Sequence, residues 1–242
     1  MRLRLERVLV AVRDPQSPPQ AAIAKALDLA PRAGVRVELF HAVADYIGAN
    51  PVRGRDHEGA TTRLMEDICA QRAAQLRASL QLDPTDRARI DVTAVWDYPA
   101  HAAIARRAAQ IRADLIVVQA QPHRRSGGWF LAHTEWELLR HCTIPLLISK
   151  NDRRYRHPRI LVALDPFHRH DKPARLDAEL LRTARMIRRR LRGTLASVHA
   201  YLPLPNLIAV ATAGRIPYVP PQDAAARYAA QIRRAYERTL RG

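Results

Sequence analysis

Short apolar segments alternate with amphipathic helical segments through residues 5–149. The apolar segments are rich in Val, Ile and Leu and carry little polar alternation, which is typical of strands buried on both faces of a parallel sheet. Between them, apolar residues recur at helical spacing, and Thr61 or Thr62 is expected to cap the second helix, which Asp83–Pro84 ends. The predicted strands are 5–12, 35–43, 90–96, 115–118 and 145–149, and the predicted helices are 22–30, 62–80, 100–111 and 134–141.

Strict alternation of strands and helices predicts an α/β fold: a doubly wound, five-stranded parallel sheet whose crossover helices cover both faces. In such folds the ligand crevice lies beyond the carboxyl ends of the strands, where the strand order reverses. The residues that reach this edge are Asp14 after the first strand, Val43 at the end of the second, and the loop 119–128 after the fourth.

The opening strand and turn of the chain recur later. Residues 159–166 repeat the pattern of residues 7–15, and residues 195–200 echo residues 37–42 at nearly the same offset. The second copy is predicted to contain two strands, 160–164 and 194–200, and two helices, 176–191 and 223–240, with no counterpart of the third to fifth strands. We therefore expect a complete domain over residues 1–152 and an incomplete second copy over residues 153–242.

Several segments carry a resemblance to a known family. They are the first strand with Asp14–Pro15, the run Trp96-Asp97-Tyr98-Pro99, the run 113–118, and above all 134–142 followed by 145–148. With these segments the chain resembles the universal stress protein family, in particular its tandem type E branch, with the second domain truncated. The resemblance implies an adenine nucleotide alpha hydrolase-like fold and a role in the stress response.

The same resemblance bears on ATP. Family members that bind ATP carry spaced glycines directly after the fourth strand, because the backbone there must approach the phosphates. In this chain that register falls on Gln119, Pro122, Ala132 and His133. The first domain is therefore expected not to bind ATP in the family manner, and Gly127–Gly128 is a weak substitute that is more typical of a turn. The resemblance leaves only degenerate nucleotide contacts, at Asp14, Val43, Asp165 and Ala200.

Other polar groups have alternative interpretations. His123, Arg124, Arg125 and Ser126 are a candidate anion site at the crevice mouth, or an ordinary exposed loop. His168 and His170 with Asp171 have metal-ligating side chains, but the surrounding positive charge disfavours a cation, and no metal is expected. Neither a hydrolase serine motif nor a catalytic carboxylate pair is present, so the chain is expected not to be an enzyme and to need no cofactor.

The chain is strongly basic, with a formal net charge of +17 and a pI of about 11.2. All but three of its 40 basic side chains are arginines, spread over helix faces, as in the helix 180–192. A basic chain of this kind attracts polyanions, which makes an RNA- or DNA-associated stress factor one alternative function. Arginine-rich composition alone is the other explanation, and few aromatic residues are available to stack on bases.

Location and association complete the expectations. Cys69 and Cys142 have no paired spacing, no apolar run is long enough to span a membrane, and no signal peptide is expected, which favours the cytoplasm.

Strands left without neighbours in the second copy favour a homodimer or another protein partner, or marginal stability of that half. The apolar loop 201–221 lines either a cavity for an apolar ligand or an interface. Function by binding and association is thus expected, and an ATP-binding protein or weak ATPase is the alternative if the missing half of the second copy exists.

Overall fold

The computed structural model describes residues 5–30, 34–44, 57–120, 133–165, 175–200 and 223–241. These residues divide into two compact units, with the boundary between Tyr155 and Arg156. The first unit contains the five-stranded sheet, and the second contains a two-stranded sheet.

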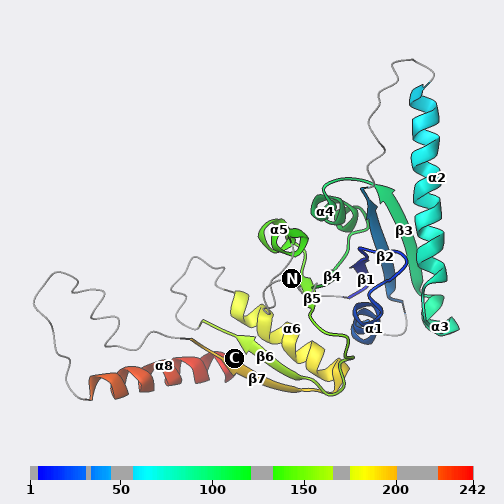
Figure 1. The fold of residues 1–242 in the computed structure, drawn as a ribbon. Coiled ribbons are helices and arrows are strands. Elements are labelled where there is room, and N and C mark those ends of the chain that lie inside the picture. Colours follow the sequence, from blue (N-terminus) through cyan, green and yellow to red (C-terminus); the bar gives the residue numbers. More distant parts are fainter. Residues whose placement is uncertain are drawn as a thin grey trace, which may run out of the picture. The chain divides into compact units, whose positions relative to one another are not determined.

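The first unit is a doubly wound parallel sheet with the strand order β3-β2-β1-β4-β5 (Figure 1). The order reverses between β1 and β4, as the alternating pattern predicts, and all four strand pairs are parallel. The fold class expected from the sequence is confirmed. The strands are β1 (Arg7–Ala11), β2 (Arg36–Val43), β3 (Ile90–Trp96), β4 (Leu115–Gln119) and β5 (Leu146–Ser149).

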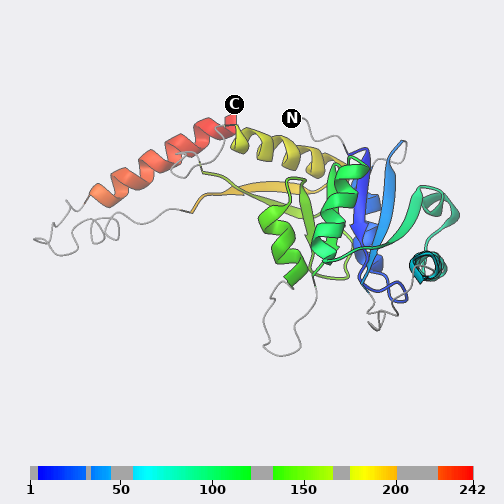
Figure 2. The ribbon, with the colours of Figure 1, turned by 90° about the horizontal axis from the view of Figure 1, so that it is seen from above.

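Helices cover both faces of this sheet (Figure 2). Right-handed crossovers place α1 (Gln20–Leu29) and α2 (His57–Ala78) on one face, and α4 (Ala100–Gln110) and α5 (His133–His141) on the other. Leu9 and Phe40 pack with apolar residues of α4 and α5 in one buried cluster. The carboxyl ends of the strands therefore remain as the open edge between the two helical layers.

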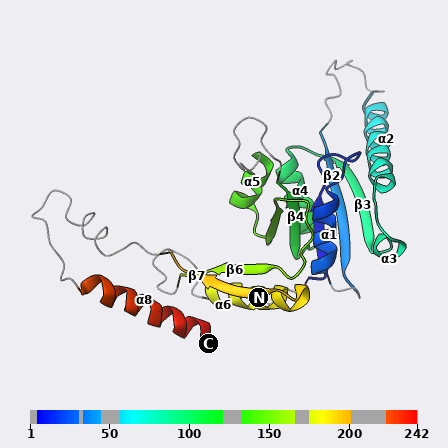
Figure 3. The same ribbon diagram turned by 60° about the horizontal axis from the view of Figure 1, so that its bottom comes forward.

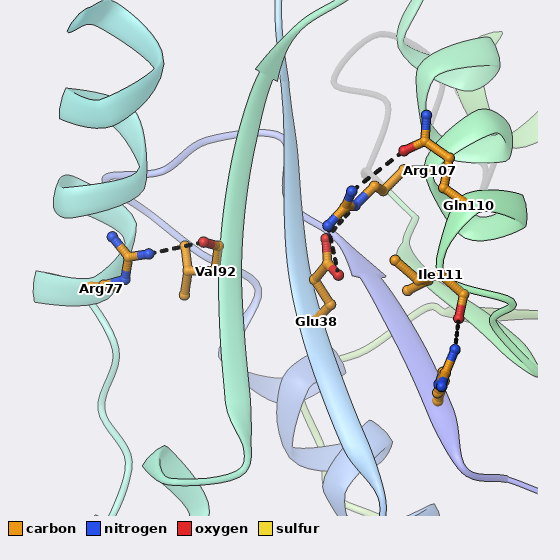
Figure 4. A network of polar contacts seen from close by, with 7 residues as sticks. Glu38, Arg77, Val92, Arg107, Gln110 and Ile111 are labelled. Atoms are coloured by element: carbon orange, nitrogen blue, oxygen red, sulfur yellow. Dashed lines mark hydrogen bonds and ion pairs between the residues drawn. The ribbon is translucent and has the colours of Figure 1, made fainter. Parts of the chain in front are cut away.

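Polar side chains also tie the helices to the sheet (Figure 4). Glu38 on β2 is buried and accepts hydrogen bonds from Arg107 on α4, Nε at 2.7 Å and Nη2 at 3.2 Å. On the other layer, Arg77 Nη2 of α2 donates to the carbonyl oxygen of Val92 on β3 at 3.0 Å. A buried carboxylate is tolerated here because a bidentate guanidinium neutralises it.

Two local expectations were wrong. The second helix begins at His57, not at Thr61 or Thr62, and both threonines lie exposed within α2. After α2 ends at Ala78, Asp83–Pro84 begins a further short helix, α3 (Pro84–Arg87), where an end was expected. Asp83 caps it by accepting a hydrogen bond from the backbone N–H of Asp86 at 2.8 Å, and proline suits the first helical position because its missing N–H is not needed there.

The second unit repeats the opening of the first (Figure 3). Its strands β6 (Arg159–Ala163) and β7 (Thr194–Val198) are parallel, and α6 (Leu176–Leu191) packs on one face of them. A last helix, α8, spans Ala224–Arg241. Within the described ranges, no further strand pairs with β6 or β7.

The repeat extends to individual hydrogen bonds. His41 Nδ1 lies 2.9 Å from the carbonyl oxygen of Val12 in the first unit, and His199 Nδ1 lies 2.9 Å from that of Leu164 in the second. The backbone N–H groups of Val12 and Leu164 also donate to equivalent strands, at 2.8 and 2.9 Å. Both copies therefore fix the exit of their first strand in the same way.

Candidate functional site

A groove of about 1080 Å³ opens at the carboxyl end of β1 in the first unit. It extends from the strand ends along α1 to the segment around α3, and polar side chains of both signs line it. Its principal polar residues are Arg13, Asp14, His41, Arg72, Asp83, Asp86, Gln119, Asp152 and Arg154. The fold thus brings Asp14 and Gln119, two residues singled out in the sequence, to one crevice.

Asp14 is exposed at the crevice and organises its own turn. Its Oδ1 accepts a hydrogen bond from the backbone N–H of Gln16 at 2.9 Å. This local bond is the usual way in which an aspartate after a strand stabilises the following turn.

Val43 does not line the groove. Its side chain is only 1 % exposed, and its carbonyl oxygen accepts a hydrogen bond from the N–H of Asp97 at 3.1 Å. The residue at the crevice from this strand is His41, whose Nδ1 is held by the carbonyl oxygen of Val12.

Gln119 stands where the resemblance places the first phosphate-loop glycine. Its Nε2 donates a hydrogen bond to Asp152 Oδ1 at 2.9 Å. The end of β4 therefore carries a bulky amide and, beside it, a carboxylate from the segment after β5. The negative charge of Asp152 repels a phosphate at the end of β4. The side chain of Gln119 also prevents the close approach of backbone and phosphate that a glycine allows.

Lys25 is a buried cation beneath this edge that sequence reasoning missed. Its Nζ donates to Ser149 Oγ at 2.8 Å and to Asn151, at 2.6 Å to the carbonyl oxygen and 3.1 Å to Oδ1. The ammonium also lies 5.1 Å from the centre of the Tyr155 ring. Burial lowers the pKa of Lys25, while the charge of Asp152 opposes this effect. One sequence signal pointed to it: a lysine in the apolar series of α1, in a chain that has only three lysines among its 40 basic residues.

The segment after β5 is bound to the first unit beyond Lys25 as well. Arg154 forms an ion pair with Asp28 at the end of α1, and this pairing raises the pKa of Arg154. Together with the hydrogen bond between Gln119 and Asp152, these contacts hold residues 149–155 along the groove. We call this segment the linker clip.

The remaining predicted residues lie elsewhere. Asp165 is half-buried after β6, with its backbone N–H 3.5 Å from Asp177 Oδ1, and Ala200 is exposed after β7. Residues 123–126, 127–128, 168–171 and 201–221 lie outside the described ranges. Among the described residues, no group of three His, Cys, Asp or Glu side chains is arranged to hold a metal ion.

The fold and the groove define the class: a doubly wound α/β protein with a polar crevice at the switch point between β1 and β4. In the part of the chain that the structure describes, no helix is both long and apolar enough to cross a membrane.

Comparisons with known proteins place this class more narrowly. The universal stress protein family matches residues 4–150. Universal stress protein E of Photorhabdus laumondii is 25% identical over 143 residues, 59% of this chain and 45% of the relative. Universal stress protein E of Escherichia coli K12 is 24% identical over 165 residues, 66% of this chain and 52% of the relative. The chain thus spans about half the length of these curated relatives.

A solved structure shows the same fold. A functionally unknown protein from Pseudomonas aeruginosa PAO1 superposes with a TM-score of 0.61 at 18% identity, over 97% of this chain and 68% of that one. The chain belongs to the universal stress protein family, and the curated relatives that it matches are of type E. This membership supports a role in the stress response.

Proposed function

We propose that this chain acts in the stress response by binding and association, that it catalyses no reaction, and that its first unit does not bind ATP in the family manner. The hydrogen bond between Gln119 and Asp152 carries the proposal. It places an amide and a carboxylate at the end of β4, where a phosphate-binding loop needs bare backbone N–H groups. Because Asp152 belongs to the linker clip, which Lys25 and Asp28 also hold, this arrangement is part of the packed unit.

Titration with a fluorescent ATP analogue in the presence of Mg²⁺ tests the proposal. We expect no saturable binding up to about millimolar concentration, an affinity equivalent to about 4 kcal/mol, and no release of phosphate from ATP over hours. Tight magnesium-dependent binding, or turnover above background, would overturn it.

A variant pair tests the physical reason. In Gln119→Gly with Asp152→Asn, the obstructing side chain and the repelling charge are both removed, so binding of the analogue is expected to become saturable below about 0.2 mM, at least about fivefold tighter than the millimolar limit for the unaltered chain, or roughly 1 kcal/mol. The control is Asp91→Asn, which removes the same charge from β3, where Asp91 pairs with Arg36 at 3.5 Å. An equal increase in the control would show that only net charge matters.

For the mode of association, we propose a homodimer formed through the second unit. Leu161 on β6 is 65 % exposed and Val198 on β7 is 41 % exposed, on the sheet face opposite α6. The equivalent residues of the first unit, Leu9 and Phe40, are buried under α4 and α5. Two chains would present the same apolar face to each other, and among the described residues no further strand pairs with β6 or β7, so a two-fold contact between two chains satisfies both at once.

Light scattering on a size-exclusion column measures this assembly. The unaltered chain is expected to elute with the mass of a dimer, and Leu161→Glu with that of a monomer. Leu139→Glu is the control, because Leu139 is 48 % exposed but lies on α5 of the first unit. A monomeric unaltered chain would refute the homodimer.

We further propose that the protein resides in the cytoplasm. Cys69 and Cys142, the two cysteines of the chain, are both free thiols. A reducing compartment keeps such thiols unpaired. Labelling with a maleimide under denaturing conditions, directly after rapid lysis, is expected to modify both. Recovery of the protein in a periplasmic fraction would contradict the proposal.

A further inference from the structure

The outer face of α6 carries a dense group of arginines. Leu181 and Ala184 of this helix pack against β6 and β7 in the core of the second unit. On another side of the helix, four arginines surround Met186 and line a shallow hollow of about 470 Å³. We call this group the arginine face; it consists of Arg182, Arg185, Met186, Arg189 and Arg190.

The charge around this face is unevenly distributed along the chain. Residues 156–242 contain 17 basic and 6 acidic side chains, so they carry +11 of the net charge of +17. The two acidic residues of α6, Asp177 and Glu179, both lie in its first turn, and neither lines the hollow. Neither Arg182 nor Arg189 forms a hydrogen bond or a close ion pair with another described residue, although Glu179 lies near enough to Arg182 to feel its charge.

The spacing of the face suits a row of phosphates. At a rise of about 1.5 Å per residue, Arg182 and Arg189 are about 10 Å apart along the helix axis. Phosphates of one strand recur about every 3.4 Å of rise along the duplex axis, so a row of this length can contact more than one of them. Guanidinium groups bind phosphate oxygens through two parallel hydrogen bonds, which makes arginine well suited to this contact.

The same face is poorly suited to two other anionic surfaces. A helix that binds a lipid surface needs apolar side chains directed at the lipid, whereas the apolar side of α6 is packed against its sheet. A site for single-stranded nucleic acid uses aromatic side chains for stacking, and residues 176–192 contain no Phe, Tyr or Trp. Burial also lowers the pKa of Arg190, because part of its guanidinium is removed from water.

We propose that the arginine face of α6 binds the phosphate backbone of double-stranded nucleic acid without regard to sequence. The site lies in the second unit and is independent of the ATP proposal for the first. Backbone contacts of this kind position a protein on a duplex but read no bases. DNA and RNA duplexes offer the same phosphate chemistry, and the experiment distinguishes them.

Fluorescence anisotropy on the full chain tests the proposal, with labelled 20-base-pair duplexes of DNA and of RNA and with the single strand. The variant is Arg182→Gln with Arg189→Gln, two arginines that form no hydrogen bond or close ion pair with any residue the structure describes. We expect its affinity for the preferred duplex to fall at least tenfold, and the slope of log affinity against log salt to decrease in magnitude by about two. Arg182→Lys with Arg189→Lys is expected to retain most of the affinity, and circular dichroism checks that each variant is folded.

The matched control is Arg233→Gln with Arg234→Gln, which removes the same charge from exposed positions on α8. An equal loss in this control would show binding by net charge and overturn the proposal. Equal affinity for the single strand, or complete displacement by polyglutamate at equal charge concentration, would overturn it as well, because the partner would then be a flexible strand or an acidic protein. A preference between the DNA and RNA duplexes identifies the source of the phosphates.

Discussion

Arg192 and Gly34 occupy the same place in the two copies of the repeat. Each lies two residues before the second strand of its unit and has a positive φ, 52° for Arg192 and 83° for Gly34. This left-handed conformation ends a helix, and in α6 the backbone N–H of Arg192 donates to the carbonyl oxygen of Arg188. Glycine adopts it without strain, whereas arginine does not.

We therefore expect Arg192→Gly to stabilise the second unit by about 1 kcal/mol. The measurement is the free energy of unfolding in urea, together with resistance of the second unit to limited proteolysis. Arg192→Ala is the control, because it removes the same charge but keeps a Cβ atom. An equal gain in unfolding free energy for Arg192→Ala would show that the effect comes from removing the charge and not from the backbone conformation.

The ion pair between Arg107 and Glu38 is expected to matter for stability. Arg107→Leu leaves the buried carboxylate of Glu38 without its partner, which costs about 3 kcal/mol of unfolding free energy. The neighbouring Arg106→Leu removes an ion pair with Asp97 at an arginine whose side chain is 52 % exposed, and its cost is expected to be below about 1 kcal/mol. Similar costs for both variants would contradict this account.

Lys25 predicts a specific pH dependence. The pKa of Lys25 is lower in the folded state than its ordinary value of 10.5. Just below pH 10.5, the unfolded chain therefore keeps a proton on Lys25 that the folded chain has begun to lose. The unfolding free energy consequently rises with pH in this window. Between pH 8 and pH 10, the unaltered chain is thus expected to gain stability relative to Lys25→Met. Burial raises the pKa of Tyr155, so its opposing effect sets in as the pH approaches its ordinary value of 10.0, and it is present in both proteins. Parallel stability curves for the two proteins would refute the role of Lys25.

Gly193 has no room for a side chain. A Cβ atom there would lie 2.3 Å from the carbonyl oxygen of Pro158, which accepts a hydrogen bond from Thr194 N–H at 3.0 Å. Gly193→Ala is expected to destabilise the second unit by about 2 kcal/mol, seen as faster amide hydrogen exchange in β6 and β7. Thr194→Ala, at the next and exposed position, should change exchange much less.

The fold was predictable because each strand is a short apolar run bounded by turn residues. All seven predicted strands are present, with ends that differ by at most two residues. The start of α2 was missed because a threonine before an apolar helical pattern is typical of a helix cap, and the sequence does not distinguish this from a threonine within the helix. The short helix after Asp83 was missed because Asp-Pro both ends one helix and begins another.

The site was less predictable because its partners are distant in sequence. Asp14 and Gln119 were found because they follow strands whose ends must meet at one edge. Lys25 bonds to residues 124 and 126 positions away, and no local pattern announces which polar groups converge on a buried ammonium. The contact of Asp152 with Gln119 was equally hard to predict, because it depends on the path of the segment after β5 past the end of β4.

The unequal division of charge makes ionic strength act differently on the two halves of the chain. Residues 156–242 carry +11, and the preceding residues carry the remaining +6 on a longer segment. Mutual repulsion among close arginines weakens a compact state, and about 0.15 M salt screens it beyond about 8 Å. We therefore expect dialysis into low salt to destabilise the second half of the chain more than the first.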